Sequence, residues 1–351
     1  MSRTIEIQPN DRILISRNDR LGDLILALPF VETMKIRYPE CQIEVMASLY
    51  ASPILENNNR INNIFRVQND QLAIDKPYKK DLLRRITQRS YKVVIALYPE
   101  RRVCQLFHRA KIPFRVGTAG RFHSVFFNYH LFHSRKSNLK HEYEYNLDFL
   151  EFFREGKIVT TPRVYLYRKE INYATEILKK AGVENSFVVL HPGSSGSAER
   201  WPVNRFIQLY QALTQSGLSV VISGSEPEGV MIDGICAKLG IPVKKITGET
   251  DLRTLAAVLS LATVVVANST GPLHLATAVD TKVVGLYSGK DVMSPKRWGP
   301  LGDNHRVIQP SGIKCNCPPK QCRCMETITV DQVADQVVSL FNSIDKHKVV
   351  R

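Results

Sequence analysis

The stretch SRNDRLGDLILALPF, residues 16–30, follows an apolar run typical of a β-strand and ends in residues typical of a helix. It groups Arg17, Asp19, Arg20 and Asp23 around a single glycine. In open α/β sheets the carboxyl ends of strands and the amino ends of helices converge, and ligands bind there. The stretch therefore predicts an α/β fold with charged side chains at its ligand-binding edge.

Segments typical of strands alternate with segments typical of helices along the chain, which predicts parallel sheets with helices on both faces. A first series contains DRILISR, one helix over residues 24–39, QIEVMAS, a helix from about Pro53, YKVVIALY and a helix over residues 140–153. A second series begins at NSFVVLHPG and continues through the strands KKITG, TVVVAN and KVVGLYS. We expect two doubly wound, Rossmann-like domains that face a central cleft. The expected bounds are 1–163 and 164–327, followed by a C-terminal helix in 328–351.

Length and composition are those of a soluble two-domain protein. The chain has 351 residues, more than one hydrophobic core usually serves, with 44% hydrophobic and 23% charged residues. The first residues, MSRTIEIQPND, lack the apolar core of a signal peptide, and no run approaches the roughly 18 apolar residues of a membrane span. We therefore expect a cytoplasmic protein.

Nearly all of the net charge of +15 lies in one stretch. Between Lys76 and Lys140 there are sixteen Lys or Arg and two acids, a balance of +14. Such a field attracts an anionic partner, although a solvated basic face would have the same composition. Basic residues alternate here with apolar and aromatic ones, which favours an amphiphilic anion. The candidate contacts are Lys79, Lys80, Arg84, Arg85, Arg101, Arg102 and Arg121.

Two loops of the second series have residues suited to a phosphate. HPGSSGSAERWP follows an apolar strand, and its small residues let backbone N–H groups approach an anion. NSTGPLHL follows the strand VVVA and opens a helix, with a capping Ser or Thr and a proline in the first turn. An ordinary turn and a capped helix with a packed histidine are the structural alternatives. The candidate residues are Ser194, Ser195, Gly196, Arg200, Ser269, Thr270, Gly271 and His274.

A third loop, SGSEPEG, places Glu226 at the carboxyl end of the strand LSVVI. A carboxylate there can accept hydrogen bonds from both ribose hydroxyls of a nucleotide, as acids do in dinucleotide folds. A surface glutamate is the structural alternative. Because the three loops follow strands of one domain, together they favour a nucleotide diphosphate as ligand.

Four of the seven cysteines lie in CNCPPKQCRC, at Cys315, Cys317, Cys322 and Cys324. Thiolates bind zinc, but these spacings are shorter than in usual zinc knuckles, so structural packing is the preferred interpretation. Disulfides rank last because the cytosol is reducing. We expect no metal and no cofactor.

The order and wording of these motifs resemble the heptosyltransferases of bacterial glycosyltransferase family 9, which build the inner core of lipopolysaccharide. The resemblance rests on RNDRLGDLILALP, HPGSSGSAERWP, SGSEPEG, the segment from TGETDLRTL to NSTGPLHLATAV, and CNCPPKQCRCMETITVDQV. It implies the GT-B architecture, with an acceptor-binding first domain, a nucleotide-sugar-binding second domain, and a last helix that packs back toward the first.

The resemblance also implies an activity. Family members transfer heptose from its ADP-activated form to a lipid-linked saccharide, with inversion and without a metal. Gly22 and Asp23 match the family's Gly-Asp motif, in which the aspartate is the proposed general base, and we expect the glycine to allow a tight turn. Asp19 is a rival for the base, Asp23 as a helix cap is the structural alternative, and Arg17 and Arg20 are candidate acceptor contacts. The implied acceptor is anionic, at the inner membrane, and no nucleic acid is expected.

Two departures from the family pattern affect the choice of substrate. Glu199 stands where well-known members carry lysine, and Ser269 stands where many carry an aspartate that contacts the sugar. These departures therefore bear on the sugar rather than on the nucleotide. A GT-B sugar-nucleotide epimerase, a basic nucleic-acid-binding protein and a relative without catalysis remain as alternatives, and acceptor-dependent consumption of the donor separates the transferase from the epimerase.

Overall fold

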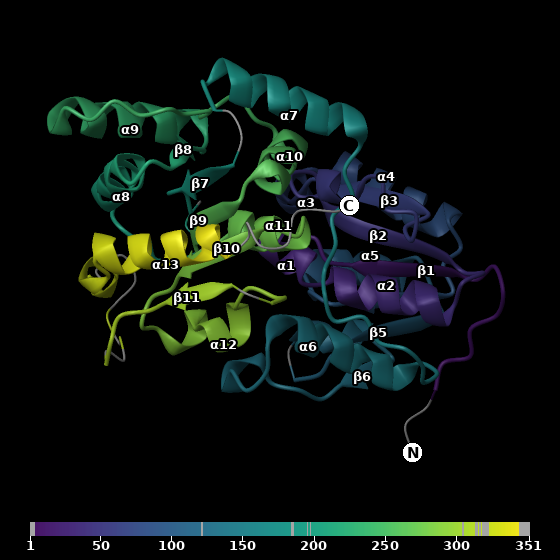
Figure 1. The fold of residues 1–351 in the computed structure, drawn as a ribbon. Helices are drawn as coiled ribbons and strands as arrows, with labels where there is room; N and C mark the ends of the chain where they lie inside the picture. Colours follow the sequence, from purple (N-terminus) through teal and green to yellow (C-terminus); the bar gives the residue numbers. More distant parts are fainter. Residues whose placement is uncertain are drawn as a thin grey trace. The chain divides into compact units, whose positions relative to one another are not determined.

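The chain forms two compact units, Met1–Tyr165 and Leu166–Arg351, each built around its own sheet (Figure 1). This computed structural model describes residues 4–120, 122–183, 186–194, 196, 198–303, 305–312, 315, 317 and 323–343. The unit boundary lies two residues beyond the expected division at 163.

The first unit contains a parallel sheet in the strand order β3-β2-β1-β4-β5-β6, the order of a doubly wound Rossmann fold. Its central strand is buried along its length because β1 pairs on both sides, with Ile13 opposite Ile43 of β2 and Val93 of β4. The strands are β1 (Arg12–Ser16), β2 (Gln42–Ser48), β3 (Asn63–Val67), β4 (Val93–Ala96), β5 (Phe114–Thr118) and β6 (Tyr129–Leu131).

Helices pack on this sheet because apolar residues at helical spacing meet alternate strand residues. Leu82 of α4 and Phe107 of α5 lie in one core with Leu14 of β1 and Val94 of β4. The helices of this unit are α1 (Leu21–Ile25), α2 (Leu28–Arg37), α3 (Asn69–Ile74), α4 (Lys76–Gln88), α5 (Arg101–Arg109) and α6 (Glu142–Leu147), with 3-10 turns at Ser52–Leu55, Phe122–Phe126, Arg135–Ser137 and Asp148–Phe152.

The second unit repeats the architecture with the strand order β11-β10-β9-β7-β8, again all parallel. Its strands are β7 (Phe187–His191), β8 (Ser219–Ile222), β9 (Val264–Asn268), β10 (Lys282–Leu286) and β11 (Arg306–Ile308). Its helices are α7 (Arg168–Lys180), α8 (Val203–Gln215), α9 (Glu226–Leu239), α10 (Leu252–Leu261), α11 (Gly271–Ala278), α12 (Pro295–Trp298) and α13 (Val330–Asn342), with 3-10 turns at Asp291–Met293 and Cys324–Thr327.

The last helix, α13, packs its apolar side into the core of the second unit. Val333, Val337 and Leu340 are buried there together with residues of α8 and of the strands, and α13 lies beside α8 (Figure 1). The helix packs there because its apolar residues form one stripe, which the α8 side of the second sheet buries. The expectation that the C-terminal segment turns back toward the first domain stays a prediction.

Four local expectations differ from the structure. The single helix expected over 24–39 is two helices, because Pro29 lacks an N–H and its ring excludes the preceding helical carbonyl. The helix expected over 140–153 is α6 followed by a 3-10 turn, and the one expected near Pro53 is a 3-10 turn. The segment KKITG contributes an isolated bridge, Ile222 to Lys245, in place of a strand.

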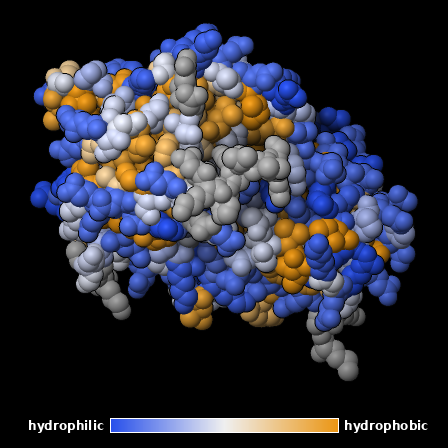
Figure 2. All heavy atoms as spheres, in the orientation of Figure 1, coloured by the Kyte–Doolittle hydropathy of each residue, from blue (hydrophilic) through white to orange (hydrophobic). Residues whose placement is uncertain are grey.

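The surface is mainly hydrophilic on the face drawn in Figure 2. Hydrophobic side chains gather there in separate patches. Among the helices that the structure describes, none combines the length and the apolarity needed to cross a bilayer.

The packing of α13 gives a direct test of stability. Leu340→Ala removes a fully buried side chain, so we expect it to lower the free energy of unfolding of the second unit by about 2–5 kcal/mol. Urea denaturation followed by tryptophan fluorescence measures this, because both tryptophans of the chain, Trp201 and Trp298, belong to this unit. The exposed Ser339→Ala is the matched control on the same helix. An unchanged midpoint for Leu340→Ala would place the helix elsewhere in solution.

Candidate active site

Each sheet has a switch point, where its strand order reverses and where doubly wound folds bind ligands. In the first unit it lies between β1 and β4, so the loop that begins at Arg17 faces the loop that begins at Leu97. In the second it lies between β7 and β9, beside the loops that follow His191 and Asn268. Three loops that the sequence singled out, those after β1, β7 and β9, are therefore switch-point loops, whereas SGSEPEG follows β8.

Arg17 is the centre of a polar cluster in the first unit, and it is 3% exposed. Its Nε donates to Asp19 Oδ1 at 2.9 Å, and its Nη2 donates to Asp23 Oδ1. Both Nη atoms donate to Glu142 Oε1 at 3.2 Å, and Nη1 also donates to Asn146 Oδ1 at 3.0 Å. Three carboxyl groups and an amide thus hold one buried guanidinium.

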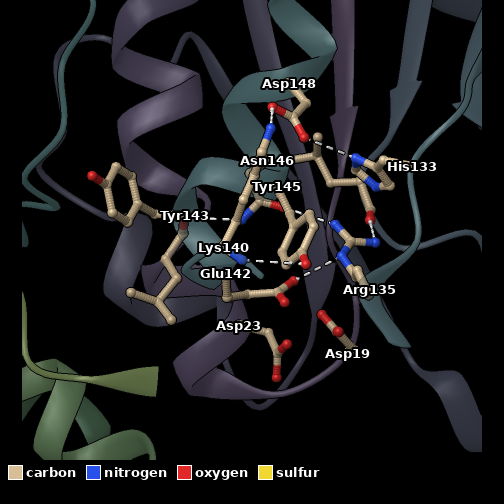
Figure 3. A network of polar contacts seen from close by, with 12 residues as sticks. Asp19, Asp23, His133, Arg135, Lys140, Glu142, Tyr143, Tyr145, Asn146 and Asp148 are labelled. Atoms are coloured by element: carbon tan, nitrogen blue, oxygen red, sulfur yellow. Dashed lines mark hydrogen bonds and ion pairs between the residues drawn. The ribbon is translucent and has the colours of Figure 1, made fainter. Parts of the chain in front are cut away.

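Arg135 completes this group, which we call the carboxylate cluster: Arg17, Asp19, Asp23, Arg135, Glu142 and Asn146. Arg135 Nε lies 3.2 Å from Glu142 Oε1, and its Nη atoms donate to Leu97 O and to Asn146 Oδ1. Figure 3 shows Asp19 and Asp23 side by side next to Glu142 and Arg135. The side chains of Asp19 and Asp23 are 13% and 16% exposed, so the cluster offers carboxylates at a partly open surface.

Helix α1 holds Asp23 in place. The helix begins at Leu21, so Asp23 is the third helical residue rather than the cap, and its carboxylate binds Arg17. Gly22 is itself helical, with its carbonyl accepting from Leu26 N at 3.0 Å. The tight turn expected at this glycine is therefore a helical turn, because the chain enters α1 directly after the loop.

Burial and charge act in opposite directions within the cluster. Burial raises the pKa of the Asp19 carboxyl to about 7, and the Asp23 carboxylate adds to this rise while Arg17 opposes it. Burial by itself lowers the pKa of Arg17, but Asp19, Asp23 and Glu142 raise it above its usual value. Burial also raises the pKa of the Tyr98 phenol, with Asp19 as the next cause. Asp19 is thus a carboxyl group that changes its charge near neutral pH.

The predicted acceptor residues are distributed unevenly. Arg17 is buried against protein carboxylates, so the structure gives it a different environment from the expected open contact, whereas Arg20 is exposed. The remaining described candidates lie on α4 and α5, two helices that pack against each other. Arg84 binds Asp81 and Arg102 binds Glu100, while the guanidinium groups of Arg85 and Arg101 lie over the rings of Phe65 and Phe122, respectively. Lys79 is half-buried and Lys80 is exposed. Arg121 lies outside the described residues.

In the second unit, Asn268 joins two of the predicted loops. Its Oδ1 accepts from Trp201 N at 2.9 Å and its Nδ2 donates to Pro192 O at 2.8 Å. The loop after β7 is therefore held over the end of β9, where Gly271 opens α11. In the first turn of α11 Pro272 has no N–H and Leu273 N donates to Thr270 O at 3.1 Å, so the N–H groups of Thr270 and Gly271 are the ones suited to an anion at this edge.

The remaining donor candidates differ in exposure. Ser194, Thr270 and His274 are buried, and Ser269 is half-buried with its N–H bound to Leu286 O. Gly196, Arg200 and Glu226 are exposed, and Glu226 is the first residue of α9. Ser195 lies outside the described residues. Trp201 is fully buried and donates through Nε1 to Ile328 O at 3.0 Å, as expected of a packing residue.

Glu199 has a partner that the sequence did not predict. Lys290, in the loop after β10, binds Glu199 Oε1 through its Nζ. The side chains of Lys290 and Glu199 are 11% and 16% exposed, respectively. A lysine thus lies beside the loop after β7, but it belongs to the loop after β10 and not to the position of Glu199.

The cysteines give little support to a metal site within the described chain. Cys315 and Cys324 are buried in the core of the second unit, Cys317 is exposed, and Cys322 lies outside the described residues. Among the residues that the structure describes, no group of three or more His, Cys, Asp or Glu side chains is arranged to hold a metal ion. The zinc hypothesis for the four cysteines stays untested.

Sequence reasoning did not find Glu142, Asn146, Arg135 and Lys290. Glu142 contacts Arg17 across 125 residues, and Lys290 contacts Glu199 across 91 residues. No local pattern signals such a contact, because HEYEYN and SGKD resemble ordinary surface segments. A buried arginine after β1 implies carboxylate partners, but the sequence does not say which ones.

Two doubly wound parallel sheets, each with a switch point at its ligand-binding edge, are the fold of GT-B glycosyltransferases. The model of glycosyltransferase family 9 (heptosyltransferase) matches residues 80–327, so the chain belongs to this family. Lipopolysaccharide heptosyltransferase 3 of Escherichia coli K12 is 25% identical over 293 residues, which are 79% of this chain and 82% of that protein.

Solved structures share the fold. The family 9 glycosyl transferase from Veillonella parvula has a TM-score of 0.86 at 19% identity and covers 97% of this chain and 100% of its own. The Escherichia coli heptosyltransferase WaaC, solved with ADP, has a TM-score of 0.72 at 17% identity and covers 94% of this chain and 99% of its own. The α/β fold with two parallel sheets is confirmed.

His191, at the end of β7, makes stability depend on pH. Burial lowers the pKa of its imidazole to about 4, although Glu228 opposes this, and its Nδ1 lies 2.9 Å from Ser223 Oγ. The unfolded imidazole takes up a proton near pH 6.5 and the folded one only near pH 4, so stability falls as the pH falls between these values. We expect His191 to cost about 2 kcal/mol of unfolding free energy between pH 7 and pH 5.

Urea denaturation of wild type and His191→Asn at both pH values measures this dependence. The variant has no imidazole to protonate, so its stability should change less than that of wild type by this amount. Equal changes in both proteins would contradict the prediction.

Proposed function

We propose that this glycosyltransferase transfers a sugar, with inversion, from a nucleoside diphosphate donor to an anionic, lipid-linked saccharide. ADP-heptose is the first candidate donor and a lipopolysaccharide core is the first candidate acceptor. Family membership supports sugar transfer, and the similarity to a lipopolysaccharide heptosyltransferase and to a heptosyltransferase solved with ADP supports heptose, ADP and lipopolysaccharide. The observation that carries the proposal is the carboxylate of Asp23, bound to buried Arg17 at the switch point of the first sheet.

Asp23 is the proposed general base. As an acceptor hydroxyl attacks the anomeric carbon, a carbon–oxygen bond forms and the bond from that carbon to the diphosphate breaks. The hydroxyl becomes more acidic during this step, so an ionised carboxylate at hydrogen-bond distance takes its proton. The leaving group departs as the nucleoside diphosphate, which carries away the negative charge. Arg17 is the proposed positioning residue for this carboxylate rather than an acceptor contact.

The second unit is the proposed donor site. The N–H groups at the start of α11 and the small residues of the loop after β7 suit a diphosphate, and Lys290 adds a cation beside them. Exposed Glu226 suits the ribose hydroxyls. Charge-assisted hydrogen bonds of this kind stabilise a diphosphate leaving group.

The basic helices α4 and α5 of the first unit are the proposed acceptor surface. Several of their cations are exposed, and others lie over aromatic rings. A lipid with phosphates and sugar carboxylates matches this mixture, and it would bring the enzyme to the inner face of the membrane. The proposed location is accordingly cytoplasmic and peripheral to the inner membrane.

A screen of sugar nucleotides tests the function. ADP-, UDP- and GDP-sugars, including ADP-heptose, are supplied with and without a heptose-deficient lipopolysaccharide, and release of the free diphosphate is measured. Acceptor-dependent release of ADP supports the proposal, whereas acceptor-independent consumption favours an epimerase. Release of the diphosphate from another sugar nucleotide would identify that compound as the donor in place of ADP-heptose. No release from any donor would contradict the proposal.

Asp23→Asn tests the base. We expect kcat to fall about 100- to 10,000-fold, because a positioned general base contributes that much, while ADP still binds the second unit normally. Steady-state kinetics and calorimetric ADP titration measure the two effects. Glu155→Gln, on an exposed residue of the same unit, makes the same charge change outside the cluster and should leave both values unchanged. Normal turnover by Asp23→Asn would show that another group, with Asp19 first, takes the proton.

Lys290 and Glu199 give a paired test of the donor site. Lys290→Met should raise the Kd for ADP about 10-fold, because a charge-assisted hydrogen bond to phosphate is lost. Glu199→Gln should lower that Kd, since the carboxylate repels the diphosphate and competes for the lysine. Calorimetry measures both, with the exposed Lys296→Met of α12 as the control. Wild-type affinity in both variants would exclude Lys290 from the diphosphate site.

A further inference from the structure

Glu142 lies deeper than either aspartate of the carboxylate cluster. It is 1% exposed, whereas the Asp19 and Asp23 side chains reach the partly open surface. Glu142 begins α6, at the opposite end of the first unit's sequence from β1. A carboxylate buried this deeply is costly unless it is paired, so its position calls for a reason.

The contacts of Glu142 lead directly to Asp23. Its Oε1 accepts from the same Nη2 of Arg17 that donates to Asp23 Oδ1, and it also accepts from Nη1. Arg135 Nε lies 3.2 Å from the same oxygen. A guanidinium is planar and rigid. Because Glu142 holds Nη1 and Nη2 of Arg17, the orientation of the N–H groups that donate to Asp19 and Asp23 is fixed as well.

Asn146, one turn after Glu142, connects the same group to α1. Its Oδ1 accepts from Arg17 and Arg135, and its Nδ2 donates to Leu26 O, at the end of the helix that carries Asp23. Helix α6 therefore holds both the guanidinium and the helix of the base. Figure 3 shows the Glu142 side chain beside Arg135 and above the two aspartates.

The charges of the cluster do not balance. Arg17 and Arg135 bring two positive charges, and Asp19, Asp23 and Glu142 bring three ionisable carboxyl groups. With all three ionised the cluster carries one negative charge, and a single proton neutralises it. The pKa of about 7 for Asp19 agrees with this count, since burial leaves one carboxyl group without full compensation.

We propose that Glu142 is a positioning residue, which acts through Arg17 to fix the orientation of Asp23 and to set the charge state of the Asp19–Asp23 pair. The inference rests on the proposed function, in which Asp23 is the base. Asp23 then takes the acceptor proton while Asp19 exchanges its own proton with solvent near neutral pH. Environments that separate two neighbouring carboxyl groups in this way are typical of acid–base sites.

Other groups also face the pair. Tyr98 and Glu100 follow β4, and Asp19 and Glu100 both contribute to raising the pKa of the Tyr98 phenol. Arg17 and Arg135 supply the positive charge. These groups are not substituted in the variants below, so a shift in the titration of the Asp19 carboxyl is attributable to the substituted residue.

Glu142→Gln is the primary test, because it keeps the shape of the side chain and removes one negative charge. The remaining carboxyl groups then ionise at lower pH, so the acid limb of kcat/KM against pH should move down by about one unit. We also expect kcat to fall about 10- to 100-fold, the loss that follows a misplacement of roughly 1 Å. Glu155→Gln, on an exposed residue of the same unit, is the matched control and should change neither value.

A second readout does not depend on turnover. Carbon-13 NMR of labelled aspartate follows the Asp19 carboxyl, assigned by its loss in Asp19→Asn, and should show titration near pH 7 in wild type and at lower pH in Glu142→Gln. Asn146→Asp adds a carboxylate and should move the same titration to higher pH. If Glu142→Gln does not fold, the direction of the shift in Asn146→Asp decides.

The outcomes separate the two proposals. Opposite shifts in the two variants support the inference even if no donor is turned over, in which case only the proposed function fails. A loss of kcat with an unmoved pH profile and an unmoved Asp19 titration would show that Glu142 only stabilises the fold, and would overturn the inference.

Discussion

The buried guanidinium of Arg17 is the interaction on which the candidate site of the first unit depends. It follows the central strand of the sheet and is 3% exposed, so its N–H groups need acceptors within the protein. Asp19, Asp23, Glu142 and Asn146 supply those acceptors from the adjoining loop, from α1 and from α6. Removing any one carboxylate changes the charge that the other carboxyl groups experience. The orientation of these groups and their protonation therefore depend on each other.

The second unit has the same architecture, but its switch point is lined by different residues. In the proposed function its switch point receives negative charge, and it offers a helix start, small residues and the Lys290–Glu199 pair. The Asn268 side chain ties the loop after β7 to the end of β9 through hydrogen bonds to the backbone of Trp201 and Pro192. A proposed donor site held in this way is preorganised, which reduces the cost of binding. A glutamate next to a lysine also lets the loop stay near neutral when no diphosphate is bound.

The alternation of apolar segments was enough to predict two doubly wound units, because burial on both faces of a parallel sheet imposes that pattern. The positions of Asp23 and of the loops after β7 and β9 also followed from it, since strand ends meet at one edge. The break at Pro29 and the short 3-10 turns were missed, because the apolar spacing continues through them while the backbone hydrogen bonds do not. Exposed Arg20 and buried Arg17 could not be told apart by residue type.

The sequence by itself determined the family, the class of fold and the residues that follow each central strand. Only the tertiary structure decided which charges meet: Glu142 with Arg17, Lys290 with Glu199, and α13 with the core of the second unit. The physical reason is the difference between local and long-range information. Strand periodicity and helix starts are set by neighbours along the chain, whereas a buried charge is satisfied by whichever partner the packing of distant elements brings within hydrogen-bond distance.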